Sequence, residues 1–435
     1  MPPEKIITIP FTSKSYTKIE ITRLLTQILP RETHHPKNQK VIYNCVKPNS
    51  AIQIFQNHFH FGNTYEAIEF ARQLKEFGVL HCIDEEGLFE EGLWRLQPFH
   101  TPNVLNTFIL VDKGEEEEEE DVFEMIHGLY NVMQQIEQDA KDKNENINYA
   151  KLTTNNPSLS KLEEDLCGLQ ILSLRQLLND GDKILAFFIN LYNIIIKYAF
   201  WKVGIPSTMY QRHAFHDGIS MNVGGHVLSL NYIYHTILRC NNNTITSNDN
   251  LRVSMMKNIS SISHSISHSM TACTTSHKDD VLDKLTLTKL DPRIHFALIH
   301  TPIPLSNIPF YSSTMIDDQL QTATQNFCEQ FKNVFIDEDS FNIHLSQIFK
   351  WYKSDFCLDE HFEVLLTYLT GKKKHMLLRM MQKEKKGLDI DVKYVPFDWD
   401  YCGGVGVIDR KEFDRECIIG ERFTMWGKMN GENCL

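Results

Sequence analysis

Four side chains that could do chemistry lie close together in the stretch DPRIHFALIH. They are Asp291, Arg293, His295 and His300, and several prolines follow them. An imidazole can act as a general base, so a histidine-rich stretch of this kind could belong to the active site of a hydrolase or transferase. The other possibility is that these groups hold a core together.

Further polar residues could complete such a pocket. The apolar segment 184–203 carries Asn190, Asn193 and Lys197 on one side, because offsets of three and four return to the same helix face. The enzyme hypothesis places five side chains in one solvent-reachable cleft: Asn190, His226, His235, Arg293 and His295. The alternative is a purely structural network, since most buried polar side chains are satisfied internally.

The opening stretch also has a structural interpretation. Ile294, Phe296 and Leu298 alternate with other residues, a pattern that predicts a short strand with one face on a core. Asp291 and Arg293 could form an ion pair at the start of this strand. The prolines that follow exclude regular pairing and predict a loop. We therefore expect the stretch to stabilise its domain rather than to catalyse.

A metal site is not predicted. His213, His216, His226 and His235, with Asp217 nearby, lack the tight paired spacing of zinc ligands. No cofactor is expected either.

Composition limits the class of protein. The net charge of −12 argues against nucleic-acid binding, which needs a basic face. Ten cysteines without a CxxC pair, and an N-terminus without an apolar signal region, predict reduced thiols in the cytoplasm. The apolar segment 184–203 has the length of a membrane span, but its Asn and Lys residues favour a buried helix.

Periodicity predicts the elements of the first hundred residues. Amphipathic spacing over 63–77, with Asn63 as a cap and Gly78 as a stop, predicts a helix. Helices are also expected at 20–29 and 51–59, with a basic arm between them. Short strands are expected at 79–84 and 93–99.

That order resembles a DEP domain, on the stretches KNQKVIYNCVKPNSAIQIF, EAIEFARQLKEFGVLHCID and LFEEGLWRLQPF. The resemblance covers 17–100 and implies a small winged-helix-like binding module without catalytic residues. Such modules dock to acidic phospholipids or to signalling proteins. Lys37, Lys40 and Lys47 on the arm are the residues expected to contact a membrane or partner, unless they are ordinary solvated charges.

A larger domain is expected over 122–402. An acidic linker (101–121) precedes it, a disordered insertion (241–280) interrupts it and a tail (403–435) follows it. Five of its blocks resemble the domain-of-unknown-function 547 family: GDKILAFFINLYNIIIKYAFWKVGIP, VGGHVLSLNYIYHTILR, DPRIHFAL, FKWYKSDF and VKYVPFDW.

The resemblance also implies what this chain lacks. Several relatives carry HFALxCG, whose thiol beside a histidine suggests nucleophilic chemistry. Here His300 and Thr301 stand at the cysteine and glycine positions, Tyr234 replaces an acidic residue, and Tyr198 replaces a helix histidine. These losses count against that mechanism.

The fold expected is α+β, with a small winged-helix-like module and a larger, mainly helical domain. The function expected is that of a non-enzymatic adaptor in intracellular signalling. It would be cytoplasmic and peripheral at membranes, and would dock to an anionic membrane surface or a signalling partner. A hydrolase or transferase using the five-residue pocket is the alternative.

Overall fold

The computed structural model describes most of the chain, in these ranges: 6–10, 14–34, 42–83, 92–101, 103–111, 120–141, 147–148, 151–152, 157–206, 209–240, 281–301, 303–357, 362–384 and 390–397. The predicted disordered insertion 241–280, the predicted tail 403–435, and Lys37 and Lys40 lie outside these ranges.

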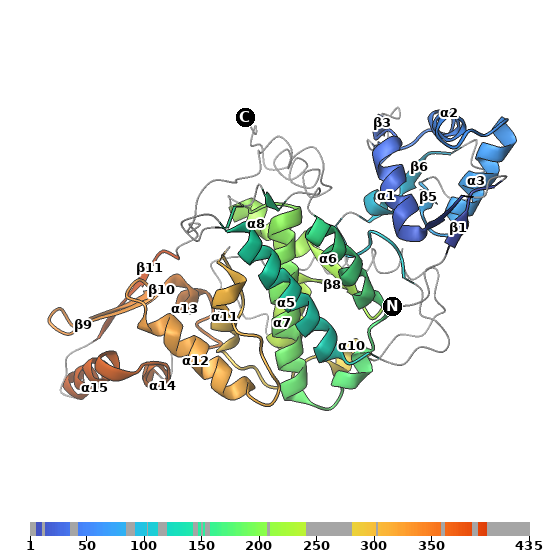
Figure 1. Ribbon diagram of the computed structural model, residues 1–435. Coiled ribbons are helices and arrows are strands. Elements are labelled where there is room, and N and C mark those ends of the chain that lie inside the picture. Colours follow the sequence, from blue (N-terminus) through green and yellow to red (C-terminus); the bar gives the residue numbers. More distant parts are fainter. Residues whose placement is uncertain are drawn as a thin grey trace.

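The N-terminal part forms a small α+β unit with its own hydrophobic core, which we call the N-terminal module (Figure 1). Its elements are β1 (Ile6–Thr8), β2 (Ser15–Thr17), α1 (Lys18–Ile28), β3 (Glu32–His34), β4 (Ile42–Cys45), α2 (Pro48–Phe59), α3 (Thr64–Glu76), β5 (Leu80–Cys82), β6 (Trp94–Leu96) and α4 (Gln97–His100). The core includes Ile7 and Ile9, so it begins before residue 17.

Local signals explain the helices of this module. Thr17 and Glu20 form a capping box at the start of α1, which satisfies two backbone N–H groups that the helix leaves open. The Asn63 side chain accepts the Glu66 N–H at the start of α3, and Gly78 follows its end at φ +65°. The helix predicted from 63–77 is confirmed.

The large domain is mainly helical, and α7 runs through its centre (Figure 1). Its helices are α5 (Val122–Ala140), α6 (Pro157–Cys167), η2 (Gly168–Ile171), η3 (Leu174–Leu177), α7 (Gly181–Lys202), α8 (Met209–Gly218), the π-helical turn η4 (Tyr232–Leu238), α10 (Val281–Lys284), α11 (Ile294–Ala297), η5 (Leu305–Asn307), α12 (Ile316–Glu329), α13 (Gln347–Trp351), η6 (Phe362–Val364), α14 (Leu365–Tyr368) and α15 (Gly371–Glu384). Within the described ranges, α7 alone is long and apolar enough to span a membrane, and its apolar window is entirely buried inside the domain.

Two small sheets belong to the large domain. The strands are β7 (Ser220–Val223), β8 (His226–Ser229), β9 (Val334–Asp337), β10 (Asn342–Ser346) and β11 (Asp391–Val395). β7 and β8 form an antiparallel hairpin, while β10 pairs antiparallel with β9 and parallel with β11. Gly224 turns the hairpin at φ +60°, and a Cβ there would lie 2.5 Å from the Leu172 carbonyl oxygen, so only glycine fits. The α+β class is confirmed.

The predicted linker is partly a fixed strap. Residues 103–111 lie along the large domain, where the backbone of Leu105 donates to Ser220 on β7 and that of Ser220 donates to Asn103. The buried Asn106 amide bonds both backbone groups of Asn222, and Gln170 donates to the Asn106 carbonyl. Residues 103–111 of the expected linker 101–121 therefore pack on the large domain, because polar residues there complete its backbone hydrogen bonds.

The two units also contact each other through α1 and α6. The Arg23 guanidinium pairs with Glu164 at 2.7 Å and donates to the Ser160 carbonyl at 2.9 Å. The Lys18 ammonium donates to the Leu110 carbonyl of the strap at 2.8 Å. These contacts fix how the module sits on the large domain.

The strand predicted for 294–298 is wrong. Residues 294–297 form the short helix α11. The Asp291 carboxylate accepts the Arg293 N–H, and the carbonyls of Asp291 and Pro292 accept from residues three positions later. An Asp-Pro pair favours the start of a helical turn, and this signal outweighs an alternation only five residues long.

Candidate functional site

Two of the five pocket candidates meet in one buried cluster, which we call the His295 network. It consists of Tyr234, His235, Arg239, His295, His300, Tyr352 and Asp355. The network draws residues from η4, from α11 with the residues that follow it, and from the turn after α13. A π-helical turn such as η4 is rare, and turns of this kind often occur at functional sites.

Hydrogen bonds run through the network from a hydroxyl to a carboxylate. The Tyr234 hydroxyl lies 2.6 Å from His295 Nδ1, and His295 Nε2 lies 2.9 Å from Asp355 Oδ2. Because the Asp355 carboxylate is an acceptor, Nε2 carries the imidazole proton and Nδ1 accepts from the hydroxyl of Tyr234. The order hydroxyl, imidazole, carboxylate is that of a catalytic triad.

Arg239 completes the pairing of the carboxylate. Its Nε and Nη2 donate to the two oxygens of Asp355 at 2.7 and 2.9 Å, and its Nη1 lies 2.9 Å from His235 Nδ1. The Tyr352 ring stacks on His295 with centroids 4.0 Å apart, and the guanidinium of Arg239 also lies over Tyr352. The ionic and aromatic contacts together hold the imidazole in one orientation.

The electrostatics favour a neutral imidazole beside an ionised carboxylate. Burial is the largest effect on His295 and lowers its pKa to about 4, despite the hydrogen bond to Asp355. Burial opposes ionisation of Asp355, but hydrogen bonds from His295 and Arg239 outweigh it and lower that pKa to about 2. Burial also raises the pKa of Tyr234, so its hydroxyl stays protonated.

The centre of the network is closed to solvent, whereas His235 and His300 at its edge are half-buried. The side chains of His295 and Asp355 are fully buried, and 1% of Arg239 is exposed. A nucleophilic mechanism needs a reachable nucleophile and donors for an oxyanion. Tyr234, the hydroxyl in the nucleophile position of a triad, is itself only 4% exposed. The hydrogen bonds are made inside the protein, as in a structural polar network.

His300, at the position of the family cysteine, continues this internal bonding. Its Nε2 lies 3.1 Å from the His295 carbonyl oxygen, and its ring lies against Tyr234. Burial lowers its pKa to about 4. The imidazole therefore supports the turn after α11.

The network predicts how stability depends on pH. The folded-state pKa of His295, about 4, lies below its ordinary value of 6.5, so the unfolded chain binds more protons between these values. We expect the contribution of His295 to the free energy of unfolding to be complete above pH 6.5. The free energy of unfolding should then fall as the pH drops towards 4. Denaturant titrations at several pH values measure this slope. A His295→Asn variant should make this slope shallower, and an unchanged slope would assign the loss to other groups, such as His300 and His100, whose pKa values burial also lowers to about 4.

Asn190 takes part in a different set of bonds, along α7. Its amide donates to the Tyr311 carbonyl at 2.7 Å and accepts the Tyr311 N–H at 2.9 Å. Asn193 bonds the backbone of Ala297 and Ile299 in the same reciprocal way. These amides fasten the chain that follows α11 to the central helix, so they are satisfied without a ligand.

Lys197 lies on the same side of α7 as these two asparagines and forms a buried ion pair. Its ammonium is fully buried, contacts the Glu137 carboxylate and donates to the Ile303 carbonyl at 2.8 Å. Glu137 in turn accepts the Leu305 N–H at 2.5 Å. The proline-rich loop is thus held to α5 and α7 together.

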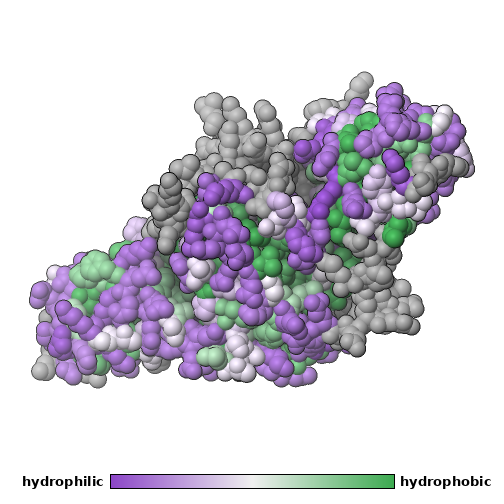
Figure 2. Space-filling model, in the orientation of Figure 1, coloured by the Kyte–Doolittle hydropathy of each residue, from purple (hydrophilic) through white to green (hydrophobic). Residues whose placement is uncertain are grey.

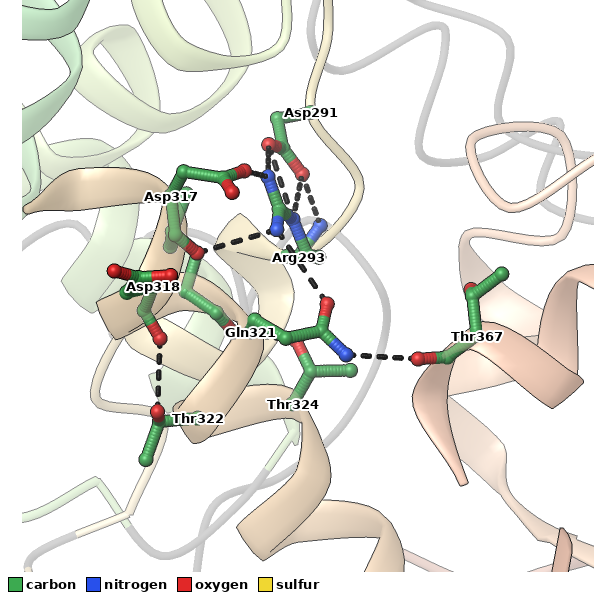
Figure 3. Close-up of polar contacts among 9 residues, drawn as sticks. Asp291, Arg293, Asp317, Asp318, Gln321, Thr322, Thr324 and Thr367 are labelled. Carbon is green, nitrogen blue, oxygen red and sulfur yellow. Dashed lines mark hydrogen bonds and ion pairs between the residues drawn. The ribbon is translucent and has the colours of Figure 1, made fainter. Parts of the chain in front are cut away.

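Arg293 lies at a third place, beside a surface cavity. The cavity has a volume of about 480 Å³ and lies between the start of α7, residues 287–293, and the side chains of Gln321, Thr367 and Tyr368. The Arg293 guanidinium pairs with both Asp291 and Asp317 at 2.6 Å, and Gln321 donates to the Thr367 carbonyl (Figure 3). The predicted pairing of Asp291 with Arg293 is confirmed. The guanidinium of Arg293 is therefore already paired with two carboxylates.

His226 lies on β8, half-buried and in register with Val223. Lys47 precedes α2, and its ammonium pairs with the Glu32 carboxylate at 2.6 Å. That pairing raises the pKa of Lys47 and lowers that of Glu32.

In the described ranges, no three His, Cys, Asp or Glu side chains are grouped so that they could hold a metal ion.

Sequence reasoning missed the residues that organise the network. Asp355 lies in the block FKWYKSDF and Arg239 ends the block VGGHVLSLNYIYHTILR, so both were inside quoted motifs. A charged residue in a block rich in apolar and aromatic residues is the signal that could have identified them. Glu137 was missed because it lies on the buried side of an otherwise regular amphipathic helix.

Residues 176–328 match the family described as "Protein of unknown function, DUF547". The match confirms the predicted resemblance for this range, which contains α7, the β7–β8 hairpin, α11 and most of α12. It stops before Asp355. Searches of the curated proteins and of the solved structures found no match. The DEP resemblance of the N-terminal module stays a prediction.

Proposed function

We propose that this chain is a non-enzymatic adaptor whose N-terminal module docks to an anionic membrane surface while the DUF547-containing domain acts as its scaffold. The observation that carries the non-enzymatic part is the closure of the His295 network. Its imidazole, carboxylate and guanidinium are buried and bond one another. This burial supports a function performed by surfaces of the protein.

The layout of the N-terminal module supports the docking part. The module has a hydrophobic core separate from that of the large domain, as an independent binding unit needs. β3 and β4 pair antiparallel, and the basic arm joins them. The contacts that hold the module to the large domain come from α1 and from the strap.

The test uses the tagged full-length chain, separated into membrane and soluble fractions. Lys37→Glu/Lys40→Glu should move the protein to the soluble fraction, because each lysine near an anionic surface contributes about 1 kcal/mol, or about 30-fold in partition for two. A salt wash should release the wild-type protein. Lys47 is left unchanged because it pairs with Glu32.

Lys183→Glu/Lys289→Glu is the matched control. It makes the same change in net charge on exposed lysines of the large domain. Equal loss with both double variants would mean that net charge, and not the arm, governs binding. If the wild-type chain is entirely soluble, membrane docking is wrong and a protein partner of the module should be sought by crosslinking.

A further inference from the structure

A second surface with the chemistry of a membrane contact lies at the opposite end of the molecule from the N-terminal module, where α15 packs beside β9 (Figure 1). The segment 371–387 is strongly basic in a chain of net charge −12. Leu377 and Met380 of α15 are fully buried. The apolar side of this helix is therefore used for packing, and its basic side faces solvent.

An exposed aromatic residue adjoins that basic side. Phe331, in the turn between α12 and β9, is 69% exposed, the largest exposure among the large apolar side chains of the described ranges. Its ring lies against Phe335 with centroids 4.4 Å apart. A membrane interface accommodates an aromatic side chain beside basic groups.

Hydrogen bonds hold the turn and the helix together. The Lys373 ammonium donates to the Glu329 carbonyl at 2.8 Å and to the Val334 carbonyl at 2.7 Å, on either side of Phe331. Lys372 and Lys374 flank it in sequence and are exposed. The turn that carries Phe331 and the helix that carries Lys372 and Lys374 are thus joined at one corner of the domain.

The charges of this corner are available for an anionic partner. Within the described ranges, Lys372 and Lys374 form no ion pair. Two carboxylates of this region have other partners, since Glu338 pairs with Arg379 and Glu329 accepts from the Thr370 hydroxyl. In Figure 2 this end of the molecule, at the lower left, is mostly hydrophilic with apolar patches between the polar side chains.

We propose that the corner formed by Phe331, Lys372 and Lys374 docks to an anionic lipid bilayer, with the phenyl ring at the headgroup level and the ammonium groups on lipid phosphates and carboxylates. This contact is independent of the basic arm. A bilayer is the occupant that fits both features, because it offers anionic headgroups directly above apolar chains. Attachment at two ends would strengthen binding beyond either contact alone where both can engage.

The test is sedimentation of the full-length chain with vesicles of phosphatidylcholine alone or of phosphatidylcholine with phosphatidylserine. The wild-type chain should bind the second kind only, and less at high salt. Phe331→Ser should weaken binding about tenfold, and Lys372→Glu/Lys374→Glu at least about 30-fold. Met315→Ser is the apolar control, because Met315 is 56% exposed at the other end of α12. Lys183→Glu/Lys289→Glu is the charge control.

Three results would overturn this inference. One is the absence of wild-type binding to the phosphatidylserine vesicles, after which an acidic protein surface becomes the occupant to test. Another is full binding by either corner variant. The third is complete loss with Lys37→Glu/Lys40→Glu and none with the corner variants, which would leave the arm as the membrane contact and preserve the proposed function.

Discussion

Replacing Asp355 with alanine is expected to lower the free energy of unfolding of the large domain by about 3–5 kcal/mol. The Arg239 guanidinium has both of its fork contacts to this carboxylate and only 1% of its side chain is exposed. Without Asp355 a buried positive charge has no counter-ion. His295 Nε2 also loses its acceptor. Denaturant unfolding followed by tryptophan fluorescence, to which the buried Trp201 of α7 contributes, measures the loss.

Asp317→Ala is the matched control for this prediction. Asp317 also pairs with an arginine, Arg293, at 2.6 Å, but its side chain is 81% exposed. An exposed pair of this kind contributes between zero and about 1 kcal/mol. Equal losses for the two variants would contradict the interpretation, because they would mean that burial of the pair adds nothing to its effect.

Removing Glu137 should be similarly costly, for the same physical reason at a different place. Glu137→Ala leaves the fully buried Lys197 ammonium without its carboxylate and the Leu305 N–H without its acceptor. We expect a loss of about 3–5 kcal/mol. Burial alone lowers the pKa of Lys197, so the helix core does not favour an isolated ammonium.

A double variant separates the pair from the rest of the packing. Lys197→Met removes the orphaned charge and fills a similar volume, so Glu137→Ala/Lys197→Met should be more stable than Glu137→Ala alone. Asp165→Ala on α6 serves as the control, since the Lys161–Asp165 pair is at the surface and its loss should cost under about 0.5 kcal/mol. A double variant no more stable than Glu137→Ala would show that the ion pair is not the source of the effect.

The two ion pairs hold different parts of the stretch DPRIHFALIHTPIPLSNIPFY. Its first half belongs to the His295 network, and its second half is held by Glu137, Lys197 and the amides of α7. The residues that invited an enzymatic interpretation are thus the ones that hold this irregular segment in the core. An irregular segment needs such partners because its backbone lacks the regular bonds of a helix or sheet.

The sequence alone determined the elements with strong local signals. The helix at 64–76 follows from apolar spacing with Asn63 and Gly78 at its ends. The buried α7 follows from its length and its Asn and Lys residues. These features are local, because a cap or a helical period involves residues only a few positions apart.

The tertiary structure decided which polar groups meet. His295 and Asp355 are 60 residues apart, and Asn106 reaches Asn222 across 116 residues. No local period encodes such distances. The sequence therefore could not show which of the predicted pocket residues belong to the His295 network, which bond the backbone along α7 and which lie beside the surface cavity. The wrong strand prediction for α11 has a local reason instead. Five residues are too few for a period to decide, and the Asp-Pro turn that begins α11 outweighed their alternation.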